Sequence, residues 1–462
     1  MDPHNEPTTN FSQLRQSFEN LILIDENLKI QPALAKSWRM IDNTTWEFML
    51  RDGVKFHNGD ILTATDVEWC LNRIMAAGAN SGPRKSYVAW FDSVRAVDDM
   101  TIQIKTKGPY PAVLAASYIP IIIPKKYFEQ VGADGFNKAP VGTGPYKIDG
   151  WSVNQKLELS AFADYWGGKP AIPHATFRVI PDESTRINEL VTGGVDVVIN
   201  LSPSRVADLK SKPSIKLTTK PSVLNFYLGF NTHQKPFDDL RVRQAIASAI
   251  DVPTMIKELL SGYGTAANSL VHSTSFGWNK DLVPFSYNPD KAKQLLTDAG
   301  YPKGFSSTLM GGPSLWPVTK ESGEAISGFL SDVGIKAPMT LLEWGDYFDR
   351  YRNTKLDGLF LFGNSSPGLE PALHLTLNFH SPPTGRGLYW ASPEVDQLID
   401  AAQTDLNPAS QADKYMKVQQ ILHDQVAAVP LWQYNEIAAV GPRVAWQARG
   451  DYYIQVAEIK PA

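Results

Sequence analysis

The side chains that bind metals or act as nucleophiles are few in this sequence. The 462 residues include eight histidines and one cysteine. His374 and His380 are the closest histidine pair, and their spacing fits neither one face of a helix nor a zinc motif. Cys70 falls on the apolar stripe of an expected helix, which indicates a small core residue and not a nucleophile. We therefore expect no catalytic residue, no cofactor and no site for a bare metal ion.

The sequence also lacks two common motifs for acyl and phosphoryl chemistry. Neither G-x-S-x-G nor G-x-x-x-x-G-K-[ST] occurs. Gly142 and Gly144 form a G-x-G pattern, but Pro145 follows and removes an amide that a phosphate cradle needs. We interpret this segment as a turn. A carbohydrate-active hydrolase is the alternative from another class of protein, because two of the 48 acidic residues could face each other across a sugar.

The composition is that of a globular protein with no preference for polyanions. Hydrophobic residues make up 43%, the net charge is -4, and no long run of like charge indicates a surface for nucleic acid or an anionic membrane. The longest apolar stretch, 111–124, is too short to span a bilayer and contains Pro120, so we expect two buried segments there. The polar residues after Met1 indicate either a cytosolic protein or a processed or trimmed chain.

The elements that would position a site begin with a hairpin and a helix at residues 46–69. Alternating apolar and polar residues suit a strand with one buried face, and an Asp-Gly tight-turn signal follows. Residues 54–56 can then resume a paired strand. Thr65 or Asp66 can cap the helix, because a short side-chain oxygen accepts hydrogen bonds from backbone amides that have no partner inside the helix.

Helices and strands alternate along the rest of the chain, which is typical of α/β construction. A helix is expected from Asp182 to a glycine stop at 193–194, followed by a strand at 195–199. Two long helical patterns, 393–404 and 408–426, precede the last strands. The length suggests about three domain-sized units. No flexible linker separates the halves of the chain, so we expect them to move as hinged bodies.

Five collinear blocks resemble the family 5 extracellular solute-binding proteins, the peptide and nickel branch of ABC-importer receptors. Segment 46–69 is similar to the family's W-x-F-x-L-R-x-x-V-x-F-x-N-G block and the helix start after it. The other four blocks are PVGTGPYKI at 140–148, DYWGGKPAI at 164–172, FNTHQKPFDDLRVRQAIASAID at 230–251 and PDKAKQLLTDAGY at 289–301. Together they span most of the chain.

The resemblance implies an α/β fold with the two lobes of a periplasmic binding protein (type II, cluster C-like), which close over a ligand. Lobe one would comprise 1–230 plus 433–462, with an extra subdomain inserted at about 22–140. Lobe two would comprise 231–432, and the hinge strands would be 223–230 and 431–438. Family members usually carry a short strand and an export or lipoprotein sequence before the position of Asp2-Pro3. We therefore expect a periplasmic protein and a trimmed chain.

Two segments match places where dipeptide receptors of this family hold the ends of their ligand. Arg350 falls where an arginine meets the ligand carboxylate, which a guanidinium binds through two points; the alternative is an exposed arginine paired with Asp346. Asn364, Ser365 and Ser366 fall where an aspartate meets the ligand's amino group. Because this acid is replaced by neutral residues, we expect a solute that lacks an obligatory free amine or presents hydroxyls, as a sugar conjugate or opine-like molecule does.

Further binding residues are expected from regional matches. Arg84, Tyr87 and Trp90 occupy the loop that offers an arginine and a tryptophan to a metal chelate in the nickel branch, and a cation over a ring would contribute about 0.5 to 2 kcal/mol. Other candidates are the residues after the Asp-Pro and three aromatic platforms: Thr8, Thr9, Asn10, Trp344, Phe362 and Trp432.

These matches together predict a solute receptor of an ABC importer and not an enzyme. It would capture a small peptide-like or sugar/amino-acid-conjugate ligand between two lobes and deliver it to a membrane permease. We expect a monomer with no nucleic-acid partner. The alternative within the family is a receptor for nickel or another metal chelate.

Overall fold

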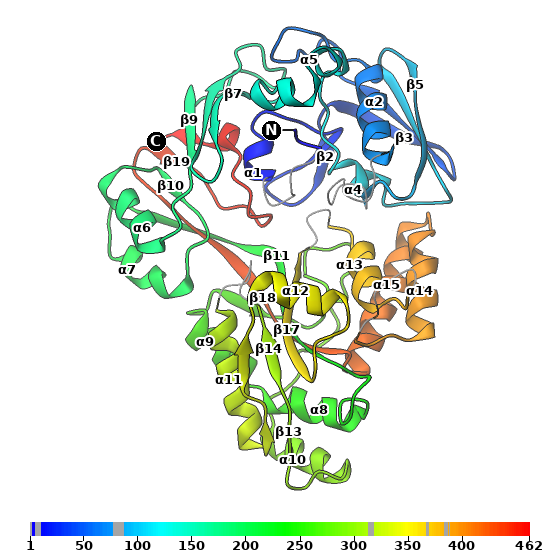
Figure 1. Cartoon of the computed structure of the whole chain (residues 1–462), viewed down its shortest axis with the longest axis vertical. Coiled ribbons are helices and arrows are strands. Elements are labelled where there is room, and N and C mark those ends of the chain that lie inside the picture. The colour runs from blue at the N-terminus through cyan, green and yellow to red at the C-terminus, as the bar shows by residue number, and fades with distance from the viewer. Residues whose placement is uncertain are drawn as a thin grey trace. The chain divides into compact units, whose positions relative to one another are not determined.

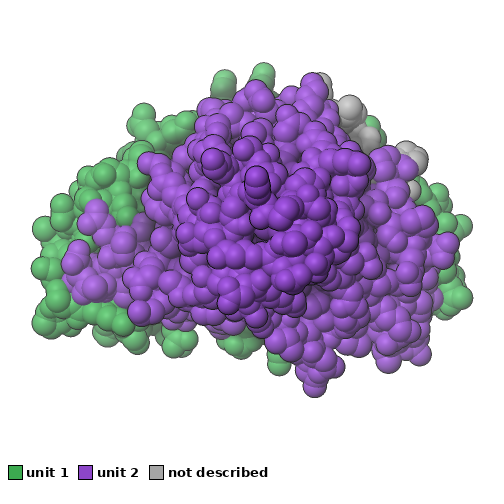
Figure 2. All heavy atoms as spheres, turned by 90° about the horizontal axis from the view of Figure 1, so that it is seen from below, with its two compact units in different colours: residues 1–200, 210–218, 438–462 green, residues 201–209, 219–437 purple. Residues whose placement is uncertain are grey.

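The computed structural model describes residues 2–4, 11–76, 87–312, 318–365, 369–382, 387 and 389–462. The chain divides into two compact units, which are coloured separately in Figure 2. Unit 1 comprises residues 1–200, 210–218 and 438–462, and unit 2 comprises residues 201–209 and 219–437. The chain therefore passes between the units four times.

The boundaries of these units differ from those of the lobes predicted from the sequence. The predicted boundaries follow residues 230 and 432, whereas the last two changes of unit follow residues 218 and 437. Residues 224–230 pair in register with 359–365, and this ladder places them in unit 2. The division into a closing pair of lobes with an inserted subdomain stays a prediction.

Unit 1 contains a four-stranded and a three-stranded antiparallel sheet, two antiparallel strand pairs (β1-β2 and β19-β20) and several helices (Figure 1). The four-stranded sheet has the order β3-β4-β6-β5, with β3 at Ala35–Asp42, β4 at Thr45–Leu50, β6 at Thr101–Thr106 and β5 at Phe91–Asp98. The three-stranded sheet consists of β7 at Tyr146–Ser152, β8 at Lys156–Ala161 and β9 at His174–Arg178. The helices are α1 at Phe11–Leu14, α2 at Ala64–Ala76, α4 at Val113–Ser117, α5 at Lys125–Lys138 and α6 at Glu183–Thr192.

The remaining elements of unit 1 are short. They are β1 at Ile22–Ile24, β2 at Ile30–Pro32, β10 at Val197–Val198, β19 at Val444–Ala445, η3 at Val456–Glu458 and β20 at Lys460–Pro461. The strand expected at 195–199 is thus only β10, which pairs with residues 439–440. The helix expected before it is confirmed as α6, with the Asp182 side chain capping its start and Gly193 in the left-handed conformation at its end.

The hairpin predicted for residues 46–56 is wrong. β4 pairs with β3 on one side and with β6 on the other. Because both edges of β4 are occupied by these strands, residues 54–56, all of them described, lie outside its ladders. Val54 and Phe56 are instead fully buried in the core of unit 1.

The start of α2 also differs from the prediction. The helix begins at Ala64, so the cap position falls on Thr63 and not on Thr65 or Asp66. The backbone amide and the hydroxyl of Thr63 donate to one carboxylate oxygen of Asp66, at 3.0 and 3.1 Å. An acid three residues after the cap commonly reaches back in this way.

Two expectations about buried apolar residues in unit 1 are confirmed. Cys70 on α2 is fully buried, and burial raises the pKa of its thiol. The stretch 111–124 forms α4 and then a buried segment after Pro120 in which Ile121, Ile122 and Ile123 have no exposed surface. Among the described residues, no helix combines the length and hydropathy that a membrane span requires.

Unit 2 is built on one mixed sheet, which includes several of the predicted binding residues (Figure 1). Its order is β18-β11-β17-β14-β16, and β12 pairs with β18. β17 is antiparallel to β11 and parallel to β14. The strands are β11 at Lys216–Phe230, β12 at Gly264–Ala266, β14 at Leu309–Gly311, β16 at Met339–Leu341, β17 at Leu359–Ser365 and β18 at Ala428–Val440. A separate parallel pair consists of β13 at Phe305–Ser306 and β15 at Ile335–Lys336.

Helices connect these strands, as expected for α/β construction. They are η2 at Pro203–Arg205, α7 at Val206–Lys210, α8 at Leu240–Ala249, α9 at Val252–Leu259, α10 at Pro289–Asp298, α11 at Thr319–Asp332, α12 at Trp344–Arg352, α13 at Ala372–Phe379, α14 at Pro393–Gln403 and α15 at Pro408–Asp424. The two long helical patterns predicted near the end of the chain are confirmed as α14 and α15.

Candidate functional site

Five of the predicted binding residues lie on two adjoining elements of unit 2. Trp344 and Arg350 are on α12, and Phe362, Asn364 and Ser365 are on β17. The hydroxyl of Tyr347 on α12 donates to the carbonyl oxygen of Leu361 on β17 at 2.6 Å. This bond between two buried groups fixes the helix on the strand and brings the five residues into one region.

Stacked aromatic rings fill the space between α12 and β17. The rings of Tyr351 and Phe362 are parallel within 7°, with their centroids 3.9 Å apart. Tyr227 on β11 lies 6.0 Å from Phe362, and Trp344 stacks on Phe348 at 5.4 Å. Phe362 is 7% exposed, so one face of the predicted platform is already covered by Tyr351. Sequence reasoning missed Tyr351, although its position four residues after Tyr347 places both on one face of α12.

Two asparagine side chains lie opposite each other at the end of this aromatic group. Asn225 on β11 and Asn364 on β17 are paired in register, 2% and 8% exposed. Their amide nitrogens donate to the carbonyl oxygens of Ser269 at 3.3 Å and Leu270 at 3.1 Å. Both side-chain oxygens are buried without a hydrogen-bond partner in the described part of the chain. Sequence reasoning missed Asn225, although an amide inside the apolar run 223–230 is an available signal.

His374 on α13 extends this polar group and is electrically neutral. Its two ring nitrogens lie 2.9 Å from the amide nitrogen of Asn364 and 2.8 Å from that of Asn378. Burial lowers the pKa of His374 to about 3. His380, in contrast, contacts Asp400 at 3.2 Å. Within the ranges that the structure describes, no three His, Cys, Asp or Glu side chains gather as metal ligands would.

Arg350 is half-exposed and pairs along its own helix. Its Nε atom lies 3.1 Å from each carboxylate oxygen of Asp346, one turn earlier. An exposed pair of this kind contributes at most about 1 kcal/mol and exchanges readily with other anions. The pair therefore leaves the guanidinium able to exchange Asp346 for a solute carboxylate, and the role of Arg350 as a ligand stays a prediction.

The other predicted residues are not all brought to this region. Trp432 on β18 is fully buried and contacts Phe226 at 5.4 Å. Because neighbouring residues of a strand point to opposite faces, Phe226 and Trp432 lie on the sheet face away from Asn225 and Tyr227.

The remaining predictions fall in unit 1 or outside the described residues. Trp90 stacks on Tyr110 with the ring centroids 5.1 Å apart, and Tyr87 lies at the start of the same described segment. Ser366, Arg84, Thr8, Thr9 and Asn10 lie outside the described residues. These five stay sequence-based predictions.

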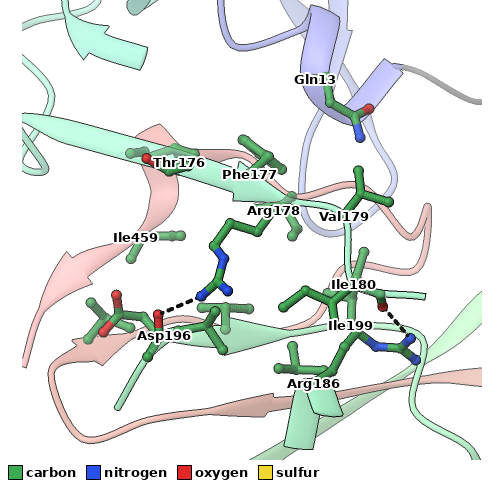
Figure 3. Close-up of a pocket in the computed structure, with 18 of the residues that line it drawn as sticks. Gln13, Thr176, Phe177, Arg178, Val179, Ile180, Arg186, Asp196, Ile199 and Ile459 are labelled. Atoms are coloured by element: carbon green, nitrogen blue, oxygen red, sulfur yellow. Dashed lines mark hydrogen bonds between the residues drawn. The ribbon is translucent and has the colours of Figure 1, made fainter. Parts of the chain in front are cut away.

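Unit 1 contains a separate pocket that includes none of the predicted residues (Figure 3). Its volume is about 600 Å³, within the range of small-molecule sites. β9, the start of α6, β10 and the C-terminal segment form its walls. Figure 3 shows Arg178 and Arg186 among the residues around it.

Known proteins with similar sequences and folds include several binding proteins. The model of the bacterial extracellular solute-binding proteins, family 5, matches residues 29–384. Heme-binding protein A of Haemophilus influenzae is 30% identical over 448 residues, which cover 90% of this chain and 81% of that protein. Glutathione-binding protein GsiB of Escherichia coli K12 is 30% identical over 456 residues, which cover 93% of this chain and 86% of that protein.

A solved structure extends this likeness to the fold. The periplasmic binding protein DppA of Helicobacter pylori, in complex with the peptide STSA, has a TM-score of 0.83 and 26% identity. The match covers 100% of this chain and 95% of that one. The match of the family model and of these relatives over most of the chain shows the class, that of the solute-binding proteins. The chain belongs to the bacterial extracellular solute-binding proteins of family 5, and its role is that of a receptor for an ABC importer.

Proposed function

We propose that this chain is a periplasmic receptor that captures a peptide-like or sugar/amino-acid-conjugate solute and hands it to a membrane permease. Relatives named for heme, glutathione and dipeptides support a small solute as cargo. The observation that carries the proposal about the solute is the polar group of Asn225, Asn364 and His374, because all three side chains are buried and neutral.

The neutrality of this group decides which end of a solute it can favour. A buried carboxylate would attract an ammonium group strongly, whereas an amide oxygen offers a hydrogen bond without a compensating charge. The oxygens of Asn225 and Asn364 have no hydrogen-bond partner among the described residues, and a solute that reached them would have to offer hydroxyl or amide donors. A free α-amine is therefore not required of the solute, and Arg350 on the neighbouring helix is the proposed partner for its carboxylate.

The same proposal includes three narrower statements about the protein. It acts without catalysis, so the solute leaves unchanged; it works as a monomer; and it binds no nucleic acid. The slightly acidic composition, with a pI of about 6.1, supports the last statement. The peptide-like or conjugate solute is favoured over a metal chelate, because one face of Trp90 is already covered by Tyr110.

Calorimetry with matched ligands tests the solute class. Each of several dipeptides and its N-acetylated form would be titrated into the protein, followed by sugar conjugates of amino acids. We expect acetylation to change the dissociation constant by less than about threefold. Submicromolar binding of ordinary dipeptides that acetylation abolishes would overturn this proposal. Native mass spectrometry of the purified protein would identify retained solute, and recovery of a chemically altered solute would contradict the absence of catalysis.

A further inference from the structure

The pocket of unit 1 has mostly apolar walls. Ile172, Val197, Ile199, Val444 and Ile454 are partly buried and pack against the core cluster that includes Val440 and Trp446. All five of these partly buried residues also line the pocket. Apolar side chains that keep part of their surface uncovered around a volume of about 600 Å³ suit the apolar body of a small molecule.

The charged side chains in the described wall of this pocket are matched except for one. Arg178 on β9 binds Glu189 at 2.8 and 3.3 Å, and Asp196 binds Arg443 at 2.6 Å. Arg186 on α6 instead donates to backbone carbonyl oxygens only: those of Ile180 and Pro181 at 3.0 Å, and that of Asn200 at 3.3 Å. The wall therefore carries one positive charge that no described carboxylate balances.

Arg186 also keeps an unused hydrogen-bond donor. Its Nε atom is buried and has no hydrogen-bond partner in the described chain. A buried donor without a partner costs about 1 to 3 kcal/mol, and more when the group is charged. The Nε atom is closed to the pocket, so a carboxylate would contact the outer guanidinium nitrogens and balance their charge.

Gln13 also lines this pocket and carries a buried polar atom. The side-chain oxygen of Gln13 has no hydrogen-bond partner among the described residues. Figure 3 shows Gln13 and Arg186 on opposite sides of the pocket, with Val179 labelled between them. An apolar space with a polar residue on either side suits an elongated molecule with a charged head.

From these contacts we infer that the pocket of unit 1 is a second binding site, for an apolar carboxylate whose head group binds Arg186. This site is separate from the solute site proposed on α12 and β17 of unit 2. Its failure would therefore leave the proposed receptor function untouched.

Titration with octanoate, 1-octanol and octylammonium tests the inference, because the three probes share one apolar chain and differ in the head group. Calorimetry is expected to give a dissociation constant for octanoate at least about tenfold below that of 1-octanol, as a charge-assisted hydrogen bond contributes more than this factor. Octylammonium is expected to bind most weakly. Methyl signals of Ile172, Ile199 and Ile454 in nuclear magnetic resonance spectra should shift with octanoate.

Two variants and a matched control locate the interaction. Arg186→Gln is expected to bring octanoate to the affinity of 1-octanol, whereas Ile199→Phe, which fills the pocket, should weaken both probes. The control Arg178→Gln/Glu189→Gln removes a neighbouring guanidinium together with its partner and is expected to change octanoate binding by less than about threefold. Circular dichroism checks that each variant is folded.

Three results would overturn the inference. They are equal affinities for octanoate and 1-octanol, no octanoate binding up to millimolar concentration, and octanoate binding that neither Arg186→Gln nor Ile199→Phe weakens. The last result would mean that octanoate binds elsewhere on the protein.

Discussion

His57 is a single residue whose protonation state bears on stability. Its Nε2 atom bonds to the carbonyl oxygen of Gly144 at 2.9 Å, and its ring lies edge-on against Phe162 with a centroid distance of 5.0 Å. Burial lowers the pKa of His57 to about 4. In the unfolded chain the pKa is near 6.5, so the unfolded state takes up the proton first as the pH falls.

The expected result is an acid-dependent loss of stability. The contribution of neutral His57 is complete above pH 6.5 and declines as the pH falls towards 4, by up to about 3 kcal/mol. Urea denaturation between pH 8 and 4 measures it. His57→Gln should flatten this part of the profile, and the same change at exposed His174 controls for loss of an imidazole as such. An unchanged slope in His57→Gln would contradict the assignment.

Asn364 offers a test of solute recognition by one atom exchange. In Asn364→Asp, an oxygen replaces the nitrogen that now donates to the carbonyl oxygen of Leu270 and faces His374. We expect the free energy of unfolding to fall by about 1 to 3 kcal/mol, because a buried donor is lost and two oxygens face each other. The new charge should also make free dipeptides bind at least about tenfold more tightly than their acetylated forms.

Calorimetry on wild type and variant gives the ratio of the two affinities. Asn364→Leu, which is similar in size and has no polar atoms, is the control and should leave the ratio near that of the wild type. If the aspartate variant shows the same ratio as the wild type, Asn364 does not face the amino end of the ligand.

At the scale of elements, Asp66 joins the starts of two helices. One of its carboxylate oxygens accepts the Thr63 amide and hydroxyl at the start of α2, and the other accepts the amide of Lys125, the first residue of α5, at 2.9 Å. Asp66→Ala should therefore lower the free energy of unfolding by about 2 to 3 kcal/mol, whereas Thr63→Ala, which loses only the hydroxyl bond, should cost about 1. Urea denaturation compares them, and equal costs would contradict a joint role.

Gly142 stands where two segments of unit 1 approach closely. A Cβ atom there would lie 2.0 Å from the carbonyl oxygen of Ser17, which accepts the amide of Gly144 at 3.0 Å. Gly142→Ala must separate these segments and should cost about 3 kcal/mol or more. Gly328→Ala is the control: it lies within α11 with open space around the added atom, and should stabilise by about 0.5 to 1 kcal/mol. Thermal unfolding ranks the two, and a mild Gly142→Ala would contradict the close approach.

Local signals in the sequence were sufficient for several elements. The Asp182 cap and the Gly193 stop predict α6 because both act through their own backbone neighbours. Strand partners were not predictable in this way. β4 pairs with β3 and with β6, which lies some fifty residues later in the chain. Nothing in segment 46–56 distinguishes this pairing from a hairpin.

The candidate site shows the same limit. Arg350, Phe362 and Asn364 were all predicted to bind the ligand, and the structure brings them together on α12 and β17. The sequence could not show that Trp432 lies on the other face of the sheet, because this position depends on the packing of Phe226 against Trp432 on β18. Asn225 was missed because its significance arises only from its register with Asn364.

At the scale of the whole molecule, the chain crosses between the units four times. Residues 201–209 and 219–437 are both bounded by segments of unit 1, so neither part of unit 2 contains an end of the chain. The predicted binding residues fall in both units, so we expect solute binding to affect both units. A ligand shifts the conformational equilibrium of its receptor only by the difference between its affinities for the two conformations.

Hydrogen exchange with mass spectrometry tests that response once calorimetry has supplied a solute. At a concentration about 100-fold above the dissociation constant, a solute stabilises the bound state by about 2.7 kcal/mol. Backbone amides that exchange only after the solute dissociates should then exchange about 100-fold more slowly. We expect slower exchange in α12 and β17 of unit 2 and also in segments of unit 1, because sequence reasoning places ligand contacts in both. Phe362→Ala, which removes a ring of the aromatic stack, should abolish the protection in both units together, since one bound molecule produces both effects. Two results would contradict this expectation: protection confined to unit 2, or protection in unit 1 that survives Phe362→Ala. Either result would mean that one bound solute molecule does not protect both units.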